Sequence, residues 1–77
     1  MDKHEQLLFY IGQKIKAKRT SKKMTQLELA CLVNCEIKSI QRVEKGTMSM
    51  NIRLFMSLCE ILEIAPEELL TSFDLTD

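Results

Sequence analysis

The chain has 77 residues, of which 45% are hydrophobic and 29% charged, and this length and composition suit one small globular domain. No stretch reaches the roughly 18 apolar residues that cross a membrane, and the N-terminus lacks a basic segment before a long apolar run, so we expect no span, no signal peptide and a cytoplasmic location. The formal net charge is zero, but residues 1–50 hold ten Lys or Arg against five Asp or Glu, and residues 51–77 hold one Arg against six acids. This asymmetry indicates either a basic working face with an acidic far side or ordinary solvated charge.

Apolar residues recur at intervals of three and four along the chain, and glycine and proline are scarce, so the predicted fold class is all-α. The first helix is expected over about residues 3–18, with Leu8, Ile11 and Ile15 as its buried stripe. The polar segment 19–24 should then form a turn.

The second helix is expected over about residues 26–33. Thr25 is a good N-cap and Glu28 follows it by three residues, which is the spacing of a capping box. Asn34 marks the corner after this helix, because asparagine tolerates the left-handed backbone conformation better than most residues.

Three further helices complete the prediction. The third spans about residues 36–45 and ends at Gly46, and the fourth spans about residues 51–62. Pro66 suits a first helical position and opens the fifth helix, over about residues 66–72.

The fourth helix carries more apolar residues than a single core stripe needs. At about 100° per residue, its core stripe is expected to hold these side chains: Ile52, Phe55, Met56, Leu58, Cys59 and Leu62. Leu54 and Ile61 widen the apolar arc, and Phe73 adds apolar surface after the fifth helix. A homodimer interface over about residues 51–75, with Leu54, Ile61 and Phe73 in it, would cover this surface. The alternative is packing of the C-terminal residues onto the fourth helix.

Four segments together resemble one family: IGQKIKAKR, MTQLELA, SIQRVEKG and LCEILEIAPEELL. They are similar to the Cro and phage-repressor class of helix-turn-helix regulators over about residues 11–70. The resemblance implies a five-helix lambda-repressor-like DNA-binding domain over residues 1–77, with the helix-turn-helix at about 25–46. It also implies a homodimeric transcriptional regulator on a palindromic operator. Among short members, the restriction–modification controller proteins are nearest in size, and phage repressors are a further possibility.

In this family the third helix enters the major groove of double-stranded DNA. Lys38 and Arg42 could each donate to a guanine, and Gln41 could pair with an adenine. Gln26 resembles the phosphate-binding glutamine of the family. The residues expected to contact DNA are Gln26, Lys38, Ser39, Gln41, Arg42 and Lys45. The alternative for the outward side chains is a solvated polar face.

The resemblance implies a structural role for Arg19 and Glu44. They are expected to form a partly buried ion pair and not to contact DNA. Glu36 departs from the family, because it stands where the family usually has a Ser or Thr as helix cap. It also brings a negative charge near the expected DNA surface.

The chain has an odd number of cysteines, namely Cys31, Cys35 and Cys59, and it has no CxxC pair. Neither a disulfide framework nor a metal site is therefore expected. Only one histidine, no Gly-rich phosphate loop and no spaced nucleophile–base pair are present, so we expect no enzyme, no cofactor and no small-molecule ligand. The alternative function is an antitoxin that binds a toxin and its own promoter.

Overall fold

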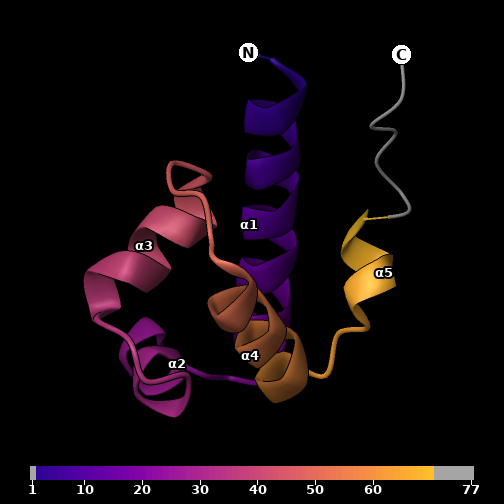
Figure 1. The fold of residues 1–77 in the computed structure, drawn as a ribbon. Coiled ribbons are helices and arrows are strands. Elements are labelled where there is room, and N and C mark those ends of the chain that lie inside the picture. Colours follow the sequence, from indigo (N-terminus) through magenta and orange to yellow (C-terminus); the bar gives the residue numbers. More distant parts are fainter. Residues whose placement is uncertain (1, 71–77) are drawn as a thin grey trace.

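The computed structural model describes residues 2–70, and within that range the chain forms five α-helices and no strand. They are α1 (Lys3–Ser21), α2 (Gln26–Leu32), α3 (Ile37–Lys45), α4 (Ile52–Leu62) and α5 (Pro66–Leu70). The long α1 forms the axis of the molecule, with α2 and α3 on one side of it and α5 on the other (Figure 1). The predicted all-α, five-helix fold is confirmed, whereas Phe73 of the expected interface lies outside the described residues.

The expected boundaries of the first four helices hold within three residues, and the fifth begins at Pro66 as expected, whereas its expected end near residue 72 lies outside the described residues. Helix α1 continues to Ser21, past the expected end near residue 18. The hydroxyls of Thr20 and Ser21 donate to backbone carbonyls of the preceding turn, which lets these polar residues stay helical. Lys23 then takes a left-handed conformation with φ of 57°, and the chain turns toward α2.

Local side-chain chemistry fixes the start of α2 and the corner that follows it. The backbone N–H of Glu28 donates to the hydroxyl of Thr25 at 3.0 Å, and the N–H of Thr25 donates to the Glu28 carboxylate at 2.8 Å. This is the predicted capping box, and hydrogen bonds from the backbone and side chain of Thr25 lower the pKa of the Glu28 carboxyl. Asn34 has φ of 57° and Gly46 has φ of 75°, so both positions that the sequence assigned to sharp turns are left-handed.

The core lies where α1, α2, α3 and α4 meet. Its buried hydrophobic side chains are Ile11, Ile15, Leu29, Ala30, Ile40, Val43, Leu58, Cys59, Leu62, Ile64 and Leu69. Gly12 is needed at the crossing of α1 and α3, because a Cβ atom there would collide with the carbonyl oxygens of Val43 and Glu44. This close crossing sets the end of α3 directly against α1.

The orientation of α4 differs from the expected one. Ile52 and Met56, expected in the core, are 73% and 47% exposed. Leu54 and Ile61 are half-buried, because α4 turns the face around Leu62 toward the core. Apolar residues surround much of this helix, so hydrophobicity alone did not fix its rotation.

The helices of residues 2–70 include none that is both long and apolar enough to cross a membrane.

Candidate nucleic-acid interface

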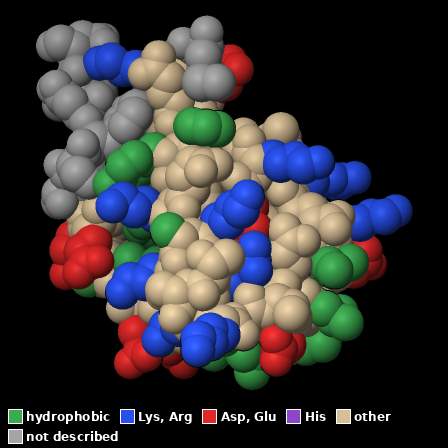
Figure 2. All heavy atoms as spheres, turned by 180° about the vertical axis from the view of Figure 1, so that it is seen from behind, with side chains coloured by type: hydrophobic (Ala, Val, Ile, Leu, Met, Phe, Trp, Pro, Cys, Tyr) green, Lys and Arg blue, Asp and Glu red, His purple; other side chains and the backbone are tan. Residues whose placement is uncertain are grey.

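The outward face of α3 carries most of the residues expected to contact DNA. Lys38, Gln41, Arg42 and Lys45 are all exposed, whereas Ile40 and Val43 are fully buried on the opposite face. The buried pair therefore fixes the rotation of α3 and leaves its polar side chains in solvent. Figure 2 shows the molecule from behind, and basic side chains project at the edge on the α3 side.

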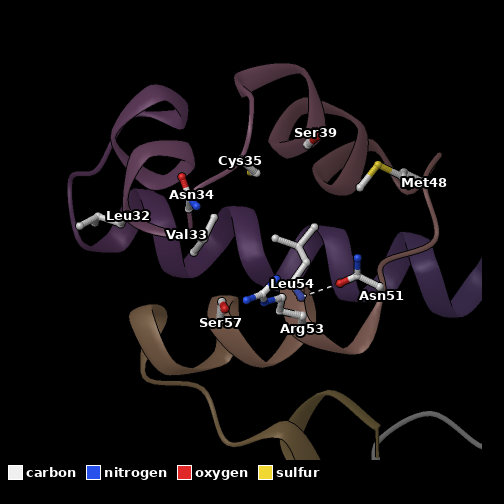
Figure 3. A pocket seen from close by; sticks show the side chains of 10 residues that line it. All are labelled: Leu32, Val33, Asn34, Cys35, Ser39, Met48, Asn51, Arg53, Leu54 and Ser57. Atoms are coloured by element: carbon white, nitrogen blue, oxygen red, sulfur yellow. Dashed lines mark hydrogen bonds between the residues drawn. The ribbon is translucent and has the colours of Figure 1, made fainter.

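Ser39 lies at the edge of this face, three residues before Arg42 on the same helix. It is half-buried and lines a groove between the α2–α3 corner and the first turns of α4 (Figure 3). Asn34 and Leu54 border the same groove, and Arg53 is its charged side chain. The structure thus places Ser39 at the edge of the outward face, in this groove.

Arg19 and Glu44 form a buried ion pair behind the α3 face. The Arg19 Nε donates to Glu44 Oε2 at 2.6 Å and Nη2 donates to Oε1 at 3.1 Å, and the two residues are only 8% and 4% exposed. The Nη1 of Arg19 also donates to the carbonyl of Met24 at 2.8 Å. The pair that the resemblance implied is therefore present, and it joins α1, the turn before α2 and the end of α3.

Gln26 belongs to the same network. Its Nε2 donates to Glu44 Oε1 at 3.0 Å, and the residue is half-buried at the start of α2. Glu44 therefore accepts bonds from both Arg19 and Gln26, which balances the desolvation of its carboxylate.

Gln26 also lines a hollow that the sequence did not predict. Its walls come from α1, α2 and α3, and its lining residues are Phe9, Gln13, Lys16, Gln26, Gln41, Glu44 and Lys45. Gln13 and Lys16 lie one turn apart on α1, a spacing visible in the sequence. Their approach to α3, however, follows from the packing of helices distant in sequence.

The start of α3 lacks the side-chain cap that α2 has. Glu36 is the N-cap residue of α3, and its carboxylate accepts no hydrogen bond from the first turn of the helix. The departure from the family pattern therefore leaves backbone N–H groups of α3 without a side-chain partner at this position.

The three cysteines of the described chain are free thiols. Burial and the charge of Glu36 raise the pKa of the Cys35 thiol, and burial and Glu67 raise that of Cys59. Both thiols are thus protonated at neutral pH, the less reactive form. Within residues 2–70, no three His, Cys, Asp or Glu side chains are grouped so that they could hold a metal ion.

Comparison with known proteins agrees with this geometry. A model of the Cro/C1-type HTH DNA-binding domain matches residues 14–74. The restriction-modification controller protein C.AhdI from Aeromonas hydrophila has a similar structure, with a TM-score of 0.75 and 31% identity over 80% of this chain and 94% of that chain. The clp gene regulator ClgR from Corynebacterium glutamicum gives a TM-score of 0.78 over 84% of this chain and 69% of that chain, and at 23% identity it supports the fold alone. No curated protein matches this chain.

Proposed function

The chain belongs to the Cro/C1-type helix-turn-helix DNA-binding domain family, and from this premise we propose that it is a homodimeric transcriptional regulator that binds a palindromic operator. The family is defined by DNA binding and not by an enzymatic activity. The likeness to C.AhdI supports a regulator of the controller-protein kind, and the Cro/C1-type domain is also compatible with a phage-type repressor. Its site of action would be the cytoplasm, where bacterial DNA lies.

The observation that carries this proposal is the polar face of α3. Because Ile40 and Val43 anchor the helix from behind, Lys38, Gln41 and Arg42 are presented together to solvent. In the major groove, Lys38 and Arg42 would donate to guanine O6 and N7, and Gln41 would pair with adenine N6 and N7.

Contacts with the DNA backbone would come from the edges of this face. Lys45 stands at the end of α3 and would neutralise a phosphate, and Gln26 stands beside it at the start of α2. Ser39 lies at the other edge, where a backbone contact would require the DNA to pass over the α4 groove.

The test measures binding to duplex DNA by fluorescence anisotropy at a series of salt concentrations. Wild-type protein should bind a selected operator more tightly than random duplex, with an affinity that falls as salt rises. Lys38→Ala should cost about 1–3 kcal/mol of operator binding by loss of a base contact. Lys14→Ala is the matched control, because this exposed lysine lies on the opposite side of α1, next to Ile64 and Leu69. Wild-type protein without salt-dependent duplex binding would overturn the proposal.

A further inference from the structure

The backbone phosphate expected at Gln26 would lie in the hollow between α1, α2 and α3, and we propose that α1 completes its binding site with Lys16 and Gln13. The inference rests on the proposed function and extends it to a helix outside the helix-turn-helix. The hollow brings side chains of three helices together beside the polar face of α3.

The charge of the hollow suits an anion. Lys16 and Lys45 come from different helices, and both side chains are exposed at its rim. The one carboxylate that borders it belongs to Glu44, which is buried and bonded twice by the guanidinium of Arg19. The negative charge of Glu44 is therefore compensated from behind, and the two ammonium groups leave the hollow positive.

Hydrogen-bond donors complete the site. A glutamine amide has two N–H donors, and Glu44 accepts one from Gln26 at 3.0 Å. This bond fixes the orientation of the amide and leaves its second N–H for an anion in the hollow. Gln13 adds a further exposed amide on the α1 wall. Arg19 and Glu44 act here as positioning residues for Gln26.

The position of the hollow favours a phosphate of DNA as its ligand over a free anion. Gln41 and Lys45 belong both to its lining and to the outward face of α3. A duplex whose major groove receives α3 therefore passes one backbone across the hollow. A phosphate held there would fix the angle of α3 in the groove without reading a base.

The experiment compares wild type, Lys16→Gln and Lys14→Gln. The two variants remove the same charge from two exposed positions of α1, and only Lys16 lines the hollow. Both variants should have the melting temperature of the wild type, measured by circular dichroism. Lys16→Gln should lower the salt slope of DNA binding by about 0.9, and it should weaken operator and random duplex by the same factor. Lys14→Gln should change neither quantity.

Equal slopes in the two variants, with wild-type DNA binding intact, would overturn the phosphate site and leave the proposed function standing. Failure of wild-type protein to bind duplex DNA would overturn both. A titration with inorganic phosphate, followed by NMR, separates the two sources of the anion. Saturable binding of free phosphate that needs Lys16, together with an unchanged DNA salt slope, would identify a free-anion site and overturn the DNA assignment.

Discussion

Among single residues, Arg19 and Glu44 join three segments of the fold through buried side chains. Exposed ion pairs contribute little to stability because water screens both charges. This pair is buried, and each partner also bonds a second group, Met24 for Arg19 and Gln26 for Glu44. Removal of either charge leaves the other unpaired away from water, and that penalty exceeds the net contribution of the intact pair.

Arg19→Met should therefore lower the free energy of unfolding by about 3–5 kcal/mol, measured by urea denaturation. Lys22→Met is the control. Lys22 lies three residues after Arg19, and its ion-pair partner Glu63 is exposed. This substitution should be nearly neutral at pH 7. A similar loss in both variants would show that the burial of the Arg19–Glu44 pair has no special energetic role.

At the scale of the helices, the contrast between α2 and α3 is informative. Helix α2 begins with a complete capping box, whereas α3 begins at Glu36 with no side-chain bond to its first turn. Asn51, by comparison, caps α4 through its side chain, which accepts from the N–H of Leu54 at 2.8 Å. Helix α3 thus begins without a side-chain cap, whereas the helices before and after it have one.

Glu36→Ser should stabilise the protein by about 1 kcal/mol, because a serine hydroxyl can accept from the first turn of α3. Thr25→Ala should destabilise it by a similar amount, and the two changes together test the caps with opposite signs. Thermal unfolding measures both. A loss of stability in Glu36→Ser would contradict this account of the α3 cap.

The capping box also predicts a dependence on pH. The pKa of Glu28 is lowered in the folded protein, chiefly by the backbone N–H of Thr25. Its contribution is therefore fully present above the ordinary pKa of a glutamate, and it is lost as pH falls through the lowered value. The destabilisation by Glu28→Gln should accordingly shrink in acid, where the glutamate is itself neutral, and a difference that stays constant down to low pH would contradict this.

The sequence predicts those features that local chemistry determines. The cap at Thr25, the corner at Asn34 and the end at Gly46 each follow from a residue type at one position, and the structure has all three. The rotation of α4 could not be predicted, because its apolar arc allows several buried faces. The α1 wall of the hollow was also missed, since Lys16 and Lys45 meet only through tertiary packing.

At the scale of the whole molecule, α4 leaves apolar surface in contact with solvent. Ile52 and Met56 lie one turn apart and are 73% and 47% exposed, beside a groove lined by Leu8, Met50 and Phe55. Leu54 and Ile61 of the expected interface are half-buried. A two-fold dimer through α4 would cover this surface and would place two α3 helices about 34 Å apart, one turn of DNA.

Ile52→Glu should therefore weaken self-association, because it places a charge in the proposed interface and disturbs no buried contact of the monomer. Leu27→Glu is the control, as Leu27 is 58% exposed on α2. Sedimentation at several concentrations should show more monomer for Ile52→Glu alone. Wild-type protein that stays monomeric at high concentration would end the dimer proposal.

Selection of bound duplexes from a random pool reports the sequence specificity and the symmetry of DNA binding in one experiment. A homodimeric regulator should enrich a palindromic sequence whose two half-sites lie about 10 base pairs apart, one for each α3 helix of the dimer. The enrichment should be lost when Arg42 is replaced by alanine. A pool that shows no enriched sequence after selection on the wild-type protein would contradict the account.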